Sequence, residues 1–176
     1  RDSPLPTGGR LVQVDGTAWM AATTLHVLEI IAFLSITDPN LLPQFQRLLL
    51  NFAMIAHNLE EGTPTESLWS EELGFYRDVI VTDTETVPLD VISIEGIVPL
   101  FATTAINRDL ARPADLLNST VAEFAADYPW LAPLLRRAGG DGTHRLVGVV
   151  GAERLVRILE RVCDPQFLLG EFGVRS

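Results

Sequence analysis

Polar side chains gather just before the first long apolar run, and their types suit the recognition of a ligand rich in hydroxyl groups. Thr7, Arg10, Gln13 and Asp15 follow one another closely, and Trp19 comes one helical turn after Asp15. Asp15 is a good N-cap, because its carboxylate can accept hydrogen bonds from the free N–H groups of a first helical turn. These groups would then meet at one helix end beside an aromatic ring, as in the wall of a site for a polyhydroxylated ligand. A capped helix after a loop explains the same residues without a ligand.

The other residues that could do chemistry do not form a recognisable site. His26 and His57 each stand alone in apolar runs, as hydrogen-bonded core histidines do. Trp69 lies beside acidic residues, where its ring could stack on a sugar or fill the core. No complete nucleophile, phosphate-loop or zinc signature is present, and we expect no cofactor. Carboxylates that gather between residues 60 and 85 have no spacing that specifies a metal, so we expect a solvated acidic face; among them are Glu60, Glu61, Glu66, Glu71, Glu72, Asp83 and Glu85.

The composition is that of a globular chain with acidic character. The chain has 176 residues, of which 47% are hydrophobic and 20% charged, with a net charge of −10. Such a charge argues against nucleic acid and anionic membranes as partners. Cys163 is the one cysteine, which excludes an internal disulfide framework and a cysteine-based metal cluster. No signal peptide is recognisable, and we expect a cytoplasmic protein.

Hydrophobic periodicity predicts a helical hairpin in the first third of the chain. Apolar residues dominate from Gly16 to Ile36, and the run Asn40–Glu61 repeats them at i, i+3 and i+4. Pro39 separates the two runs. Residues 17–36 have the length of a membrane span, but the ionisable His26 and Glu29 favour a soluble helix.

The remaining chain predicts short elements. We expect strands near Phe75–Ile80 and Val87–Ile92 around a turn. Three further helices are expected, over Ile94–Ile106, Leu116–Tyr128 and Glu153–Val162. A turn at Gly139–Gly142 and a short strand or extended link over His144–Val149 lie between the second and the third of them.

Four stretches in a consistent order carry a resemblance that spans nearly the whole chain. They are Pro4-Leu5-Pro6-Thr7-Gly8-Gly9 with Gln13–Ala21, then Leu68-Trp69-Ser70-Glu71-Glu72-Leu73-Gly74-Phe75-Tyr76-Arg77-Asp78-Val79, then Glu95–Phe101, and finally Phe172-Gly173-Val174-Arg175-Ser176. Together they resemble the glycoside hydrolase family 63-like glucosidases, a group related to processing α-glucosidase I and mannosylglycerate hydrolase. Ser70 and Leu73 depart from that family's Leu-Trp-Asp-Glu-Glu-Asp-Gly-Phe-Tyr-Tyr-Asp run.

The resemblance implies a fold class and an activity. The fold would be all-α: residues 1–176 would form one partial helical domain, roughly half of an (α/α)₆ toroid, with one small β-hairpin insertion. The whole protein would be an inverting hydrolase of α-linked glucosides or related glycosides. Such enzymes need a carboxylic acid and a carboxylate base. The resemblance places the acid upstream of Pro4 and the base downstream of Ser176, so no catalytic residue is assigned here. Asp2 is too close to the first motif to be the acid.

With the catalytic pair placed outside this chain, we expect its residues only to contact the sugar. The candidates are Gln13, Asp15, Trp19 and Glu95. Two other classes stay open: a carbohydrate-binding or isomerase-type protein of the same helical architecture without hydrolytic activity, and a helical protein-interaction module. Because a partial toroid would leave apolar helix faces uncovered, we also expect self-association through those faces.

Overall fold

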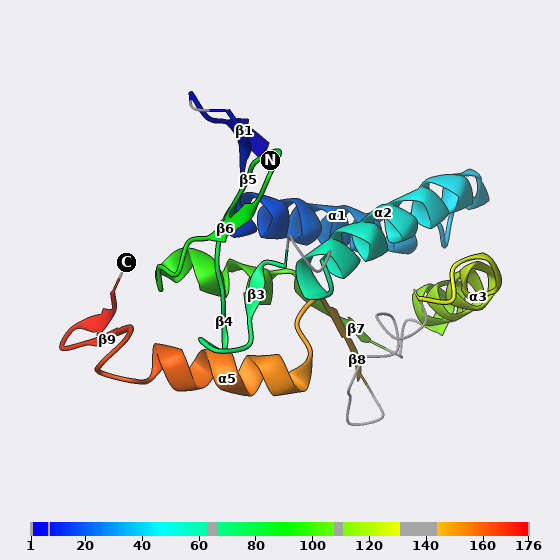
Figure 1. Cartoon of the computed structure of the whole chain (residues 1–176). Coiled ribbons are helices and arrows are strands. Elements are labelled where there is room, and N and C mark those ends of the chain that lie inside the picture. Colours follow the sequence, from blue (N-terminus) through cyan, green and yellow to red (C-terminus); the bar gives the residue numbers. More distant parts are fainter. Residues whose placement is uncertain (1, 7, 63–66, 108–110, 131–143, 176) are drawn as a thin grey trace.

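A computed structural model describes residues 2–6, 8–62, 67–107, 111–130 and 144–175, and it combines helices with several small sheets (Figure 1). The N-terminal half contains β1 (Asp2–Pro4), β2 (Arg10–Val12), α1 (Val14–Leu34), η1 (Pro39–Leu41), α2 (Leu42–Glu60), β3 (Trp69–Ser70), β4 (Phe75–Tyr76), β5 (Val79–Val81) and β6 (Thr86–Pro88). The C-terminal half contains η2 (Ile94–Phe101), β7 (Thr103–Asn107), α3 (Ala111–Asp127), β8 (His144–Gly148), α5 (Ala152–Val162), β9 (Leu169–Gly170) and β10 (Gly173–Val174).

The predicted hairpin of α1 and α2 is confirmed and supplies much of the core. Between α1 and α2, Asp38 caps the start of η1: its side chain accepts a hydrogen bond from the Asn40 backbone N–H at 3.0 Å. One face of α1 offers mostly Ala and Leu, against which α2 places larger side chains. The buried set includes Ala18, Ala21, Leu25 and Leu28 of α1 with Phe45, Leu49, Phe52 and Leu59 of α2. This packing fixes the direction of α1 and therefore the place of its first turn.

The prediction of an all-α partial toroid is wrong, because the chain builds an antiparallel four-stranded sheet in the order β1-β2-β5-β6. Strand β2 pairs with β5 in the register Arg10↔Val81 to Val12↔Val79. The close pairing needs Gly9, since its φ is +90° and an added Cβ would lie 2.6 Å from the Val81 carbonyl oxygen. We expected only a loop before α1 and one β element near residues 75–92. Strands of three residues carry too little alternation to be read from sequence.

The predicted helix over Ile94–Ile106 is correct only in its first part. Residues Ile94–Phe101 form η2, a 3₁₀ helix, and residues Thr103–Asn107 form β7, which pairs antiparallel with β8. Pro99 lies inside η2, and its ring lacks the N–H that an α-helix would use. Gly96 lets η2 approach β4, because a Cβ there would lie 2.2 Å from Cε1 of Phe75. The strand near His144 and the last amphipathic helix are confirmed as β8 and α5. The expected turn at Gly139–Gly142 lies outside the described residues.

Candidate functional site

The first turn of α1 is capped from a distant part of the chain. The Val14 backbone N–H donates to Oδ1 of Asp78 at 2.8 Å, and Asp78 stands between β4 and β5. The prediction that Asp15 is the N-cap is wrong: Gln13 occupies that position without a side-chain cap, and Asp15 lies within the first turn. The Asp15 carboxylate accepts from the Gly16 N–H at 2.6 Å. Two carboxylates therefore meet at the positive end of this helix.

The Asp78 carboxyl lies in an environment that favours its neutral form. Partial burial raises its pKa above the ordinary value of 3.8, and the negative charge of Asp15 raises it further, while the Val14 N–H opposes both. Asp78 lines a hollow of about 190 Å³ between the starts of α1 and η2. The other lining residues are Val14, Tyr76, Arg77, Leu89, Val91, Ser93, Glu95 and Gly96.

The second helix at this hollow begins with Ser93 and Glu95. The Ser93 hydroxyl caps η2 by accepting from the Glu95 N–H at 3.3 Å, and Oε2 of Glu95 lies 3.3 Å from the same hydroxyl. Glu95 is exposed, so its carboxylate is accessible at the rim of the hollow. Arg77 also lines the hollow. It forms an ion pair with Asp90, while its buried Nε has no hydrogen-bond partner in the described part of the chain.

An aromatic pair extends this surface along the same two helices. Trp19 of α1 stacks on Phe101 of η2, with ring centroids 5.6 Å apart and an angle of 21° between the planes. Each side chain is 52% exposed, so the pair presents ring surface to solvent. Trp19 lies one α-helical turn after Asp15, and Phe101 lies about two 3₁₀ turns after Glu95. Each helix therefore offers a carboxylate near its start and a ring further along.

Of the predicted sugar-contacting residues, Glu95 lines the hollow, whereas Asp15 and Trp19 lie on α1, where Trp19 stacks on the last residue of η2. Gln13 directly precedes α1, where its carbonyl accepts from the Thr17 hydroxyl at 2.7 Å. Thr7 lies outside the described residues. Sequence reasoning missed Asp78, Ser93 and Phe101 as site residues, although Asp78 and Phe101 each lie within one of the motif stretches. Only the pairing of distant segments could have placed them here.

Trp69 belongs to the core rather than to a binding surface. Its side chain is 4% exposed, its indole N–H donates to Oε1 of Glu71 at 2.8 Å, and Arg154 and Arg157 of α5 cover its ring at 4.7 and 5.2 Å from the centroid. Behind it, the Tyr76 hydroxyl donates to the buried Glu60 carboxylate, and burial raises the pKa of Tyr76. This cluster fastens α5 to the β3–β4 hairpin.

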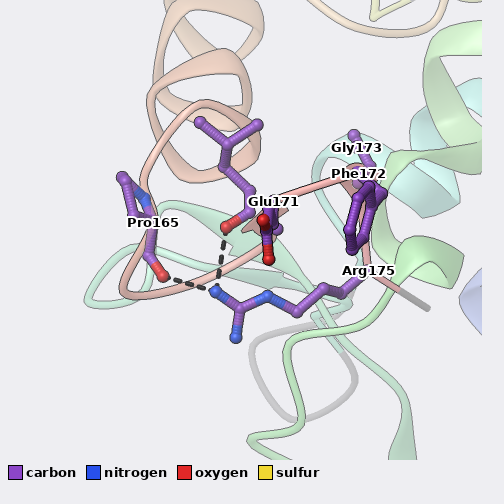
Figure 2. A pocket seen from close by; sticks show the side chains of 8 residues that line it. Pro165, Glu171, Phe172, Gly173 and Arg175 are labelled. Atoms are coloured by element: carbon purple, nitrogen blue, oxygen red, sulfur yellow. Dashed lines mark hydrogen bonds between the residues drawn. The ribbon is translucent and has the colours of Figure 1, made fainter.

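The loop of the last motif folds around its arginine. Figure 2 shows Arg175 reaching back across a hollow of about 690 Å³, where Nη2 donates to the carbonyl oxygens of Pro165 at 2.6 Å and Leu169 at 2.9 Å. Phe172, at the turn between β9 and β10, is 97% exposed. The guanidinium of Arg175 is thus engaged in holding its own loop.

The described residues contain no group of three or more His, Cys, Asp and Glu side chains that could hold a metal ion. Within them, α1 alone is long and apolar enough to cross a membrane by length and composition. Of the most apolar stretch of α1, 39% is buried inside the protein, and core helices can have the same length and composition.

Comparison with known proteins finds a similarity to an uncharacterized yeast protein. No protein-family model matches the chain, and no solved structure matches it. The chain is 28% identical over 193 aligned positions to the uncharacterized protein YMR196W of Saccharomyces cerevisiae. The alignment covers 100% of this chain but 18% of the yeast protein, so the chain spans about a fifth of that relative's length.

Proposed function

We propose that this chain supplies part of the sugar-binding wall of an inverting glycoside hydrolase that acts on α-linked glucosides or related glycosides. The observation that carries the proposal is the half-exposed stacked pair of Trp19 and Phe101, which lies on the same two helices as the carboxylates of Asp15 and Glu95. Asp78 adds a third carboxylate beside the first turn of α1. The motif resemblance to family 63-like glucosidases supports the same function. The toroid that this resemblance implied does not form part of the proposal.

The arrangement suits a neutral sugar. Pyranose rings bind by placing their apolar C–H faces on aromatic rings, while polar groups at the edge read the hydroxyls. Here Asp78 and Glu95 can accept hydrogen bonds from sugar hydroxyls. An acidic or phosphorylated sugar fits less well, because it would bring negative charge against these carboxylates.

The motif resemblance places the two groups that perform hydrolysis outside this chain. An inverting glycosidase places its acid and base about 6.5–9.5 Å apart with a water between them and the sugar. We expect both carboxylates to come from parts of the longer protein outside these 176 residues. The chain would then position the sugar, and the reaction would take place at its edge.

The test is sugar binding by the longer protein with single aromatic replacements. Trp19→Ala and Phe101→Ala should each weaken the binding of an α-glucoside, measured by calorimetry, because each removes half of the stacking surface. Phe172→Ala is the matched control, since Phe172 is a 97% exposed ring at the turn between β9 and β10 and lies on neither α1 nor η2. Unchanged affinity in both variants, with melting temperatures equal to that of the control, would contradict the proposal.

The same surface would serve a carbohydrate-binding or isomerase-type protein. Turnover separates these classes, because such a protein would bind an α-glucoside without releasing sugar from it.

A further inference from the structure

The outward face of α1 carries an exposed stripe of large apolar side chains. We define the α1 stripe by positions 19, 20, 23, 26, 27, 30, 33 and 34, all of which are exposed and lie on one side of the helix. Its large members are between 38% and 59% exposed: Trp19, Met20, Val27, Ile30, Phe33 and Leu34. The opposite side of α1 is buried in the core. Monomeric proteins seldom expose a continuous apolar surface of this kind.

The α1 stripe has a spacing that matches itself when the helix is reversed. About a midpoint between His26 and Val27, position 19 corresponds to 34, position 20 to 33, and position 23 to 30. A second α1 lying antiparallel would therefore place Trp19 opposite Leu34 and Met20 opposite Phe33 at both ends. Twofold contacts require such a self-complementary surface.

Charge along the α1 stripe also permits contact with an identical surface. The stripe contains no Asp, Glu, Lys or Arg. His26 is its one titratable group, and the Nδ1 atom lies 2.6 Å from the Ala22 carbonyl oxygen. Glu29 stands at the edge, where Thr104 of β7 donates to its Oε2 at 3.1 Å. No like charges would be buried between two copies.

We propose that the α1 stripe binds a second copy of this chain, with the two α1 helices antiparallel about a twofold axis near His26 and Val27. An anionic lipid surface is a poorer occupant, because the chain carries a net charge of −10. The same charge opposes association over the rest of the molecule, so added salt should strengthen the dimer. Trp19 belongs both to the α1 stripe and to the surface that we propose binds sugar. Association of two copies would therefore compete with sugar binding.

The first experiment measures mass against concentration by light scattering. The wild-type chain should rise from monomer toward twice that mass, and more steeply at higher NaCl concentration. Val27→Glu should keep the chain monomeric, because two carboxylates would meet near the axis. Val156→Glu is the matched control, since Val156 is a 55% exposed apolar residue on α5, and it should still dimerise. Circular dichroism checks that both variants are folded.

The second experiment tests the geometry with a side chain that preserves the apolar surface. In a Cys163→Ser background, which removes the exposed native cysteine, Val27→Cys should be joined to its copy by a short bis-maleimide. Val156→Cys should not. A chain that stays monomeric at every concentration and salt level, with no cross-link at position 27, would overturn the proposal. Binding to neutral lipid vesicles as a monomer would assign the stripe to a membrane and would overturn it as well.

Discussion

Asp78 stabilises the start of α1 through one oxygen while its charge lies in an unfavourable place. The oxygen accepts the Val14 N–H, and partial burial together with Asp15 raises the pKa of the carboxyl. Between the unfolded value of 3.8 and the raised folded value, the folded protein holds a proton that the unfolded chain releases. Stability therefore falls as pH rises through that window, and above it the ionised carboxylate remains a cost to the fold.

Two replacements at Asp78 separate the oxygen from the charge. Asp78→Asn keeps an acceptor for Val14, and Asn caps about as well as Asp, so the melting temperature at pH 7 should equal or exceed that of the wild type. Asp78→Ala removes the cap and should cost about 0.5–2 kcal/mol. Urea unfolding from acid to neutral pH measures both effects. If Asp78→Asn lost as much stability as Asp78→Ala, the claim that the oxygen stabilises α1 while the charge destabilises the fold would be contradicted.

The residues of the candidate site differ in how far sequence could predict them. Asp15 and Trp19 were found together because they lie one turn apart on a single predicted helix. Asp78 could not be found in this way, since it reaches Val14 only after β5 has paired with β2. Trp69 stood beside acidic residues much as Trp19 did, but the arginines of α5 buried it. The neighbouring residues in the sequence therefore do not show whether an aromatic ring is exposed for binding, as at Trp19, or buried in the core, as at Trp69.

At the scale of elements, α5 is held by arginines more than by apolar packing. Among its residues only Ile158 is buried, whereas Arg157 contacts Glu71 at 2.5 Å and covers Trp69. Arg161 donates from Nε to the Leu73 carbonyl oxygen at 2.7 Å. This attachment uses charged side chains whose stems lie along the β3–β4 hairpin.

Arg157→Ala should loosen α5 without disturbing the helical hairpin. An exposed ion pair and a cation–π contact together contribute about 1 kcal/mol, so we expect a loss of that size. Amide hydrogen exchange should become faster in α5 and stay unchanged in α1 and α2, and Trp69 fluorescence should change. Arg47→Ala, an exposed arginine on α2, is the control and should alter neither. Uniformly faster exchange across all helices would contradict a local attachment.

Elements were predictable where their signal was long or strongly periodic. The pair α1 and α2 and the amphipathic α5 were predicted within a few residues. The strands of the four-stranded sheet were missed in part, since β1 and β2 are three residues long and partner each other and β5. The helix expected to reach Ile106 ended at Phe101, because the apolar threonine-rich segment after it pairs with β8.

At the scale of the whole molecule, the chain alone should have no glycosidase activity. General acid and base groups each contribute about 10²–10⁴-fold, and we expect both to lie outside these residues. The isolated chain should therefore not hydrolyse α-glucosides or mannosylglycerate, while the longer protein should hydrolyse an α-linked glycoside with inversion. Nuclear magnetic resonance of the first product anomer checks the stereochemistry. Turnover by the isolated chain, or retention by the longer protein, would contradict this assignment.

The pairing of β2 with β5 also sets an order of events during synthesis. Residues 10–12 leave the ribosome long before residues 79–81, with which they pair. The Val14 N–H likewise has no hydrogen bond to Asp78 until Asp78 has been synthesised. The α1–α2 hairpin, whose contacts are local, can form in that interval. A nascent chain at this stage carries a formed hairpin and a β2 strand that can pair with β1 but whose other edge still lacks β5. Aggregation of newly made protein through this strand edge should thus be governed by the time that translation takes to reach β5.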